Sequence, residues 1–501
     1  MIAAVDRVLG RITMYVLVLG ILVALALLAL VLALTGVVAV DPLSLVVSAL
    51  ALLATSWIAN QVLALVFRTR PLVESGLITA LLLLFVLQPT LDPAGLVGLV
   101  VAAAVAAASK YLIAWRGRHL VNPAAFGAVV AGASGLAFSS WWVGTASLLP
   151  AVALGGVVIL WRTRRLGMGV LYLVVGTAVT TGVVLAAGGD VAAGLSLALV
   201  SGPLVFAAGY MLSEPLTQPP LRWQRLAYAV VVALLSTVPY TIGPFRTTPE
   251  LALVVGGALA FLLGQRRAIR LELAAKRQLT PTAWEFRFRA AAPVRFAPGQ
   301  YLELTVPHRG AGLGGIRRVF SIASTPADAE LAIGVRIRDD ASSFKRALLA
   351  LEPGARVRAT GVWGDFTLPR DPDARLAFVA AGIGVTPFVS QLRSLAAAGR
   401  ARDAELLYAV RSASELAYRD ELAATGCRVG VLCPDDPGEL PPRWTWLGAE
   451  TLGAEAVLRA IPDAAARTVP VSGAPGDVAR LRRALRAAGT RRIRTDVFLG
   501  Y

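Results

Sequence analysis

The chain has 501 residues, of which 56% are hydrophobic and only 16% are charged, and its formal net charge is +17. Its mean hydropathy of +0.68 exceeds what a soluble protein of this length can bury, so the composition indicates a membrane protein. Two cysteines, Cys427 and Cys433, exclude a four-thiolate iron–sulfur cluster, and two histidines, His119 and His308, argue against paired haem ligands, so no metal site is predicted.

Residues 1–266 are predicted to form an all-α polytopic membrane bundle. A span needs about 20 apolar residues, and this template fits about ten segments. The segments are centred near Leu25, Leu53, Leu82, Ala103, Val130, Ala153, Val175, Leu199, Ala233 and Gly257.

Charged loops between the apolar segments predict the topology. Basic residues gather at alternate ends of the segments, whereas the intervening loops carry mainly acidic residues such as Asp41, Asp92 and Asp190. The positive-inside rule then places both termini, and the globular second half, in the cytoplasm, with the bundle in the inner (plasma) membrane. Attraction to the lipid membrane explains the net charge, and no nucleic-acid partner is predicted.

Four polar segments interrupt the apolar background of the first half: Glu74–Thr79, Gln88–Thr90, His119–Ala125 and Tyr210–Pro219. Their order and spacing resemble those of the flavin-carrying membrane subunits of the sodium-pumping NADH:quinone reductase and of the Rnf complex. In that family a threonine carries a covalent flavin. The nearest counterpart here is Thr145, which fits either a second flavin site or the start of a helix of small residues at the interface.

Glu74 and Glu214 fall near predicted cytoplasmic ends of spans. They fit either interfacial charges or a polar pocket. Pro215 and Pro219 interrupt the helix beside Glu214, and broken helices at membrane depth usually line a site.

The pattern changes after Arg270. Alternating segments such as Trp284–Phe288 and Tyr301–Val306 are typical of half-buried strands, so an antiparallel β-barrel is predicted over residues 271–369. Residues 374–501 then read as strand, glycine-rich turn, helix and strand, which predicts a parallel α/β domain.

The second half resembles the ferredoxin–NADP reductase superfamily, which binds FAD and NAD(P)H. Arg318-Val319-Phe320-Ser321 is similar to the family's flavin motif, and Ser342-Ser343 follows at a helix start. The resemblance implies that Arg318 pairs with the FAD pyrophosphate, Phe320 faces the isoalloxazine and Ser321 lies near flavin N5. The amides at Ser342-Ser343 would receive the second phosphate.

Ala381–Pro387 is similar to the family's dinucleotide loop. Gly382 and Gly384 would let the backbone approach a pyrophosphate at a helix N-terminus, and Thr386 and Pro387 would open that helix, with the threonine hydroxyl as a further donor. A strand before the loop and a helix after it give the required context.

Two later residues depart from the family pattern, and the role of two more is open. Ser472 replaces the cysteine that usually adjoins the nicotinamide, and Asp496 replaces a glutamate, so Ser321, Ser472 and Asp496 are the predicted catalytic residues. Either Phe498 or Tyr501 could cover the flavin, or both could pack the last strand. The cofactor-binding residues predicted by the resemblance are Arg318, Val319, Phe320, Ser321, Ser342, Ser343, Gly382, Gly384, Thr386, Pro387, Arg411, Arg419, Phe498 and Tyr501.

The predicted function is a membrane-bound, flavin-dependent NAD(P)H oxidoreductase. It would pass electrons through FAD to a quinone or a small ferredoxin-like protein, because the cofactors carry the reactivity and the protein positions them. Arg411 and Arg419 lie where this family selects the adenosine 2′-phosphate, which favours NADPH. Two alternatives stay open: an ion-translocating or transporter-like protein with an attached reductase domain, and a degenerate reductase without turnover.

Overall fold

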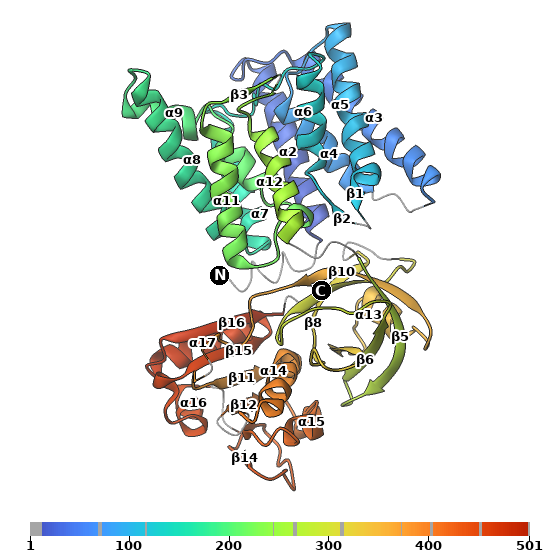
Figure 1. Ribbon diagram of the computed structural model, residues 1–501, viewed down its shortest axis with the longest axis vertical. Coiled ribbons are helices and arrows are strands. Elements are labelled where there is room, and N and C mark those ends of the chain that lie inside the picture. Colours follow the sequence, from blue (N-terminus) through green and yellow to red (C-terminus); the bar gives the residue numbers. More distant parts are fainter. Residues whose placement is uncertain are drawn as a thin grey trace. The chain divides into compact units, whose positions relative to one another are not determined.

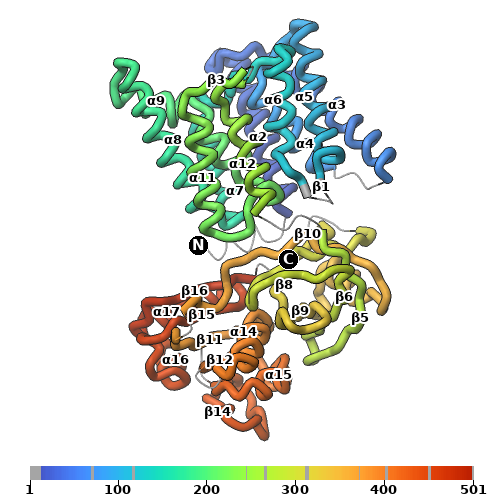
Figure 2. The backbone as a smooth tube through the Cα atoms, in the orientation of Figure 1, coloured from blue at the N-terminus to red at the C-terminus, as the bar shows by residue number. Residues whose placement is uncertain are grey.

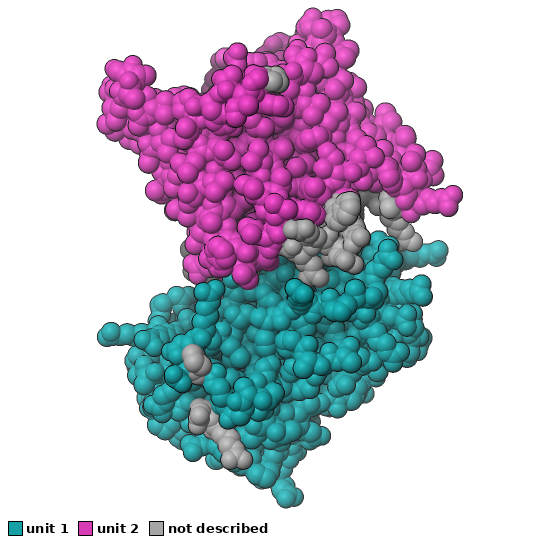
Figure 3. Space-filling model, in the orientation of Figure 1, with its two compact units in different colours: residues 1–12, 268–501 teal, residues 13–267 magenta. Residues whose placement is uncertain are grey.

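The computed structural model describes residues 13–68, 73–115, 118–243, 245–263, 268–310, 315–371, 373–400, 404–449 and 453–498. The chain divides into two compact units (Figure 3). The helical unit is Thr13–Arg267, and the sheet unit contains Ala268–Tyr501.

The helical unit consists of packed helices with two short β-hairpins (Figure 1). Its longer helices are α2 (Met14–Leu34), α3 (Pro42–Val66), α4 (Val73–Val86), α5 (Pro93–Leu112), α6 (Pro123–Ala133), α7 (Leu149–Arg162), α8 (Leu166–Ala186), α9 (Val191–Leu199), α11 (Arg222–Thr237) and α12 (Pro249–Leu263). Its short elements are β1 (Ala114–Trp115), β2 (Arg118–His119), α10 (Leu204–Phe206), the π-helix η1 (Ala207–Met211), the 3-10 helix η2 (Pro215–Thr217), β3 (Thr241–Ile242) and β4 (Phe245–Arg246).

Three helices of this unit start in the same way. Asp41, Asp92 and Asn122 each precede a proline at the first helical position. Each side chain accepts a backbone N–H three residues ahead, at 2.7, 2.8 and 3.0 Å respectively. A carboxylate or amide oxygen at the N-cap satisfies a free amide, and proline has none to lose, so these pairs define where the helices begin.

The prediction of ten full spans is not supported. Each predicted centre lies in a helix, but among the described residues only α2, α3, α5 and α8 are long and apolar enough to cross a membrane, and the bent pair Val191–Leu199 and Leu204–Met211 would make a fifth. α4 and α7 have only 14 residues each, about 21 Å at 1.5 Å per residue, whereas the hydrocarbon core is about 30 Å thick. Hydropathy counts apolar residues in loops as well as in helices, so it overestimates span length.

A break after α9 brings two glycines into close contact. The pair Val191–Leu199 and Leu204–Met211 is bent by 45°, and the π-helix η1 forms the last five residues of its second segment. A Cβ atom on Gly209 would lie 2.5 Å from Gly156 Cα, in α7. The two backbones therefore touch, which is typical of helices that pack through small residues in membranes.

The sheet unit begins with an antiparallel lobe. Its strands are β5 (Ile269–Gln278), β6 (Ala283–Ala290), β7 (Tyr301–Thr305), β8 (Arg317–Ser321), β9 (Leu331–Arg336) and β10 (Arg356–Trp363), with helix α13 (Ser343–Leu349) between β9 and β10. They form one sheet in the order β8-β7-β10-β5-β6-β9, which curls around its own core (Figure 2).

The predicted barrel is not closed. The edge strands β8 and β9 share no ladder, and only the single bridge between Ile322 and Ile333 joins their ends. β8 has five residues, and after it the chain contacts β9 only near Ala332, whose amide donates to the Ser324 hydroxyl at 3.0 Å, before it bends at Ser324. The edge is therefore too short to pair along its length.

A parallel lobe completes the sheet unit. Its strands are β11 (Ala377–Ala381), β12 (Glu405–Ala409), β13 (Arg428–Leu432), β14 (Trp444–Trp446), β15 (Thr468–Gly473) and β16 (Arg492–Val497). Its helices are η3 (Gly382–Val385), α14 (Thr386–Ala397), η5 (Ala413–Glu415), α15 (Arg419–Ala423), α16 (Ala454–Ala460), η6 (Ala464–Ala466) and α17 (Pro475–Ala487). All neighbours in the order β14-β13-β12-β11-β15-β16 are parallel, so every strand ends at the same edge.

Candidate functional site

Arg318 lies in β8 with its side chain 6% exposed. Its guanidinium carbon lies 5.1 Å from the centre of the Phe344 ring, and Nη1 donates to the Arg317 carbonyl at 2.6 Å. Alternation along the strand leaves Val319 exposed, and the rings of Phe320 and Phe344 lie 6.0 Å apart. β8 thus places the fixed guanidinium of Arg318 beside an aromatic surface.

A cluster of cations surrounds this arginine. Burial lowers the pKa of Lys345, and the positive charges of Arg318, Arg338 and Arg336 lower it further, against the opposing effect of Asp340. Mutual repulsion of this kind is relieved when an anion binds. The sequence reasoning missed Lys345 and Arg336; the position of Lys345, two residues after Ser343, was the available signal.

The start of α13 carries the two predicted serines. Ser342 is the N-cap residue, and its buried hydroxyl has no hydrogen-bond partner within the described part of the chain. The Ser343 hydroxyl lies 3.1 Å from His308 Nε2, and His308 Nδ1 lies 2.8 Å from the Val306 carbonyl. His308 therefore holds Ser343 in place, a role that the sequence did not reveal. The orphaned Ser342 hydroxyl and the cation cluster fit a pyrophosphate.

The predicted dinucleotide loop connects β11 to α14. Gly382 has a φ of +54° with open space where a Cβ would lie, whereas a Cβ on Gly384 would lie 2.4 Å from the Ser472 carbonyl oxygen. Thr386 is buried, and its hydroxyl donates to the Ile383 carbonyl at 3.0 Å, so as placed it closes the turn. Pro387 follows in the first turn of α14.

The three predicted catalytic residues come together from three strands. Ser472 on β15 and Asp496 on β16 are directly paired across the parallel ladder. The Asp496 carboxyl hydrogen-bonds to the Ser321 side chain at the end of β8. Burial raises the pKa of Asp496 to about 6, and hydrogen bonds from Val497 and Ser321 limit the rise.

Ser472 is fully buried, and its hydroxyl has no hydrogen-bond partner among the residues described. An unpaired buried hydroxyl costs roughly 1 to 3 kcal/mol, so a ligand that bonds to it gains affinity. The hydroxyl is fully buried, so a cofactor that bonds to it would first have to displace the residues that cover it.

The remaining predicted residues lie around this group. Phe498 is half-buried, and its amide donates to the Gly473 carbonyl at 2.9 Å. Tyr501 lies outside the described residues. Arg411 is exposed just after β12, and Arg419, at the start of α15, donates to the Glu439 carbonyl. Both arginines follow the end of β12 in the chain.

Polar contacts fix the antiparallel lobe against the parallel lobe. Arg393 on α14 pairs with Asp328 through two bonds of 2.7 and 3.0 Å, and the Ser390 hydroxyl donates to the Ser324 carbonyl at 2.6 Å. Arg494 Nη1 donates to the Thr367 carbonyl at 2.6 Å. These bonds set the spacing between β8 and β16 on which the Ser321–Asp496 contact depends.

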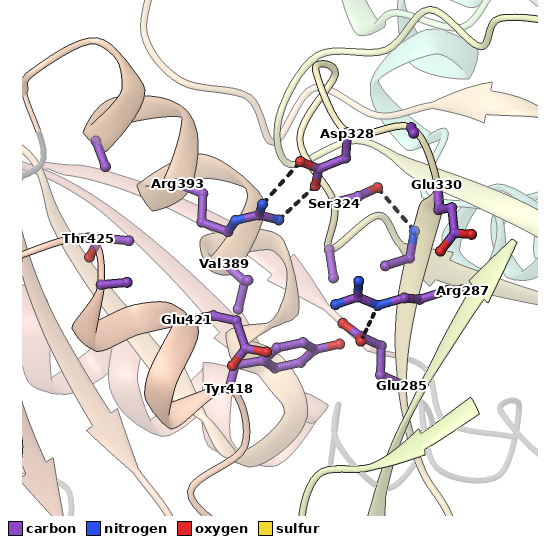
Figure 4. Close-up of a pocket in the computed structure, with 15 residues that line it drawn as sticks. Glu285, Arg287, Ser324, Asp328, Glu330, Val389, Arg393, Tyr418, Glu421 and Thr425 are labelled. Carbon is purple, nitrogen blue, oxygen red and sulfur yellow. Dashed lines mark hydrogen bonds and ion pairs between the residues drawn. The ribbon is translucent and has the colours of Figure 1, made fainter. Parts of the chain in front are cut away.

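A cavity of about 620 Å³ lies along the same seam between the lobes. Figure 4 shows the Tyr418 ring beside Glu421 and Glu285, with the Arg393–Asp328 pair on another wall. None of the predicted site residues is among those that line it. This cavity and the candidate cofactor site are therefore different places.

The helical unit contains its own polar group. Lys110 Nζ donates to the Ser75 carbonyl at 2.8 Å and lies 3.2 Å from the Ser75 hydroxyl. Glu214 interacts electrostatically with Lys110, and its Oε2 is buried without a hydrogen-bond partner in the described chain. Glu74 is exposed in the first turn of α4, outside this group. The Thr145 hydroxyl lies 3.3 Å from that of Ser147.

The comparisons with known proteins support an oxidoreductase function for the sheet unit. Residues 378–428 match the family described as oxidoreductase NAD-binding domain. Ferredoxin–NADP reductase B of Sorangium cellulosum (strain So ce56) is 38% identical over 165 residues, which are 32% of this chain and 65% of that protein. The stachydrine N-demethylase reductase subunit of Rhizobium meliloti (strain 1021) is 30% identical over 162 residues, 32% of this chain and 45% of that protein.

A solved ferredoxin NADP+ reductase from Neisseria gonorrhoeae, with bound FAD and NADP, is 19% identical and aligns with 47% of this chain and 100% of its own, at a TM-score of 0.40. The chain spans less than two thirds of the length of the two curated relatives. The sequence matches show a ferredoxin reductase-like oxidoreductase domain, and they confirm FAD and NAD(P)H as its predicted cofactors.

Proposed function

We propose that the protein is a membrane-attached reductase that takes electrons from NAD(P)H through FAD and passes them to a quinone or a small ferredoxin-like protein. The observation that carries the proposal is the meeting of Ser321, Ser472 and Asp496 from three strands of two lobes. Both curated relatives named above are reductases or reductase subunits. This supports transfer to a separate acceptor.

FAD, when bound, supplies the chemistry of accepting a hydride from nicotinamide and releasing electrons singly or in pairs. The protein's residues hold the two cofactors and orient the Ser321 hydroxyl group. Arg318 and Lys345 would neutralise the FAD pyrophosphate, and Gly382 would admit the nucleotide backbone. The Ser472 hydroxyl, which lacks a partner in the described chain, would bond to the nicotinamide side. Asp496, with a pKa of about 6, is mostly ionised at neutral pH, and its carboxylate accepts the hydrogen bond that the Ser321 hydroxyl donates.

We further propose that the helical unit lies in the inner (plasma) membrane, with both termini and the sheet unit in the cytoplasm. Four helices of suitable length and hydropathy support this placement. The ordered polar segments described above support kinship with the flavin-carrying membrane subunits. The Lys110–Glu214 group is the proposed acceptor site, because ionisable residues inside membrane domains usually mark a functional site.

The test is to purify the full chain in detergent, extract and identify its flavin, and compare quinones, ferredoxin-like proteins and a soluble dye as acceptors. Glu214→Gln should slow reduction of the physiological acceptor and spare the dye. Glu74→Gln, at an exposed carboxylate, is the matched control and should change neither rate. Absence of FAD, or equal acceptor rates in all three proteins, would contradict the proposal.

A second candidate function is ion translocation driven by the reductase. The 45° break between Val191–Leu199 and Leu204–Met211 favours it, since broken helices are common at ion and substrate sites in transporters. Ion flux into proteoliposomes on addition of NAD(P)H, abolished by an ionophore, would establish this function. NAD(P)H oxidation without flux would leave the plain reductase.

A further inference from the structure

We propose that the exposed face of α17 and the start of β16 form a docking surface for a bilayer that carries anionic headgroups. Residues 475–492 contain six arginines and one acidic residue, Asp477. The exposed arginines that make up this basic face are Arg482, Arg483, Arg486, Arg491 and Arg492. The proposal rests on the membrane attachment proposed above and adds a partner to it.

The helix is built with two different faces. Val478, Leu481 and Leu485 are buried against the parallel lobe, whereas the arginines point outward. The sixth arginine, Arg480, pairs with Asp477 near the helix start. Within the described chain no ion pair neutralises the five arginines of the basic face, in contrast to exposed arginines elsewhere in the sheet unit such as Arg289, which pairs with Glu330 at 3.2 Å. A concentrated, uncompensated charge of this kind attracts an extended anionic surface.

The topology keeps this face away from the cofactor residues. β15 and β16 are parallel, and α17 runs back between them from Pro475, just after Gly473, to Ala487, just before Arg492. Its basic C-terminal half therefore lies at the edge where the strands begin, whereas the dinucleotide loop lies where they end. A bilayer could occupy the basic face without blocking nucleotide entry.

An anionic bilayer is favoured over an acidic protein because the same chain carries four helices suited to crossing a membrane. A tethered surface is present at high effective concentration without a second binding partner. Each arginine near an anionic surface strengthens the contact by roughly five-fold, so three charges change the docking equilibrium by roughly a hundred-fold.

The experiment uses the full chain in nanodiscs. A dye is attached at Ala487→Cys, an exposed position at the end of α17, since Cys427 and Cys433 are buried. Nitroxide-labelled headgroups should quench the dye in discs of phosphatidylcholine with phosphatidylglycerol, and several-fold less in pure phosphatidylcholine or at high salt. Arg482→Gln/Arg483→Gln/Arg486→Gln should abolish the difference between the two lipids.

A triple variant of equal charge on the antiparallel lobe, Arg289→Gln/Arg356→Gln/Arg358→Gln, is the control and should quench like the parent. Equal quenching in both lipids, insensitivity to the α17 triple variant, or quenching only after an acidic protein is added would overturn the proposal. Carbonate extraction reports membrane insertion separately. Reduction of a soluble electron-accepting dye by NAD(P)H reports that the sheet unit is folded. Failure of the lipid contact is thus distinguishable from failure of the proposed function.

Discussion

The hydrogen bond between Ser321 and Asp496 joins the end of β8 in the antiparallel lobe to β16 in the parallel lobe. The two residues meet only when both lobes are folded and correctly spaced. A flavin ring and a nicotinamide ring bound in these lobes would be brought to the same place, so this bond reports the geometry on which electron transfer depends.

Replacing Arg318 by alanine should release FAD. The guanidinium is held between the Arg317 carbonyl and the Phe344 ring, and loss of a charge-assisted contact with a pyrophosphate costs about 1.5 to 3 kcal/mol. FAD fluorescence during equilibrium dialysis measures the effect. Arg317→Ala removes the same charge from the neighbouring, more exposed position and should retain FAD; equal losses in both variants would refute a specific role for Arg318.

The Asp496 carboxyl should make stability depend on pH. Because its pKa is about 6 in the folded protein against 3.8 for the unperturbed group, its ionisation costs the folded state nothing below about pH 4 and an increasing amount up to about pH 6. Asp496→Asn removes that cost. Its stability relative to the parent should therefore rise on the order of 2 kcal/mol between pH 4 and pH 7. Tryptophan fluorescence in denaturant titrations at several pH values measures this; a constant difference would be the contrary result.

Removing the Ser472 hydroxyl should separate function from packing. The hydroxyl is buried without a partner in the described chain, so Ser472→Ala should leave the thermal midpoint unchanged or raise it, because it removes a desolvated group worth about 1 kcal/mol or more. Stopped-flow flavin reduction should nevertheless slow. Ser472→Cys is the companion variant and should retain more of the rate. A lower midpoint with an unchanged rate would assign Ser472 to packing alone.

The two loop glycines should respond differently to alanine. At Gly384 a Cβ would lie 2.4 Å from the Ser472 carbonyl oxygen, a backbone atom that cannot yield, whereas at Gly382 the cost is only its φ of +54°. Gly382→Ala should cost about 1 kcal/mol. Gly384→Ala should cost more and also displace Ser472. Thermal unfolding ranks the two, and the reverse order would argue against the packed loop.

Reporter tags test the predicted topology. Tags before Met1 and after Tyr501 should both be cytoplasmic. A tag inserted beside Asp190, which caps α9, should lie outside if the shorter helices α4, α6 and α7 cross the membrane in addition to the four longer ones. Alkaline phosphatase and green fluorescent protein fusions give opposite signals on the two sides. An active phosphatase at the C-terminus would contradict the topology and would separate the sheet unit from cytoplasmic NAD(P)H.

Local patterns predicted much of the sheet unit, because its signals are short. A strand, two glycines and Thr386-Pro387 at a helix start are contiguous in the chain, and the structure has each element there. The pairing at the edge of the antiparallel sheet was not predicted correctly. Whether β8 and β9 close a barrel depends on pairing between distant strands, and the early turn at Ser324 has no strong sequence signal.

The surroundings of the candidate site were less predictable. His308 reaches Ser343, and Arg336 and Lys345 gather beside Arg318, only after β8, β9 and α13 have packed together. In the helical unit, apolar composition placed each predicted centre within a helix, although Leu199 is the last residue of α9. It did not locate the ends of α4 and α7, since helix ends depend on caps and breaks rather than on hydropathy.

The contact between Gly156 and Gly209 also constrains how this protein can change over evolutionary time. A Cβ on Gly209 would lie 2.5 Å from Gly156 Cα and must push α7 and η1 apart, whereas a Cβ on Gly156 would lie 3.3 Å from Gly209 Cα and needs a smaller shift. Substitutions at these two sites are therefore not independent, and a variant that gains a methyl group at one site has to widen the helix crossing elsewhere before it is viable. Among related chains the two glycines should be kept or lost together. The pair can therefore be used to align the α7 and η1 segments of related sequences where overall similarity is low.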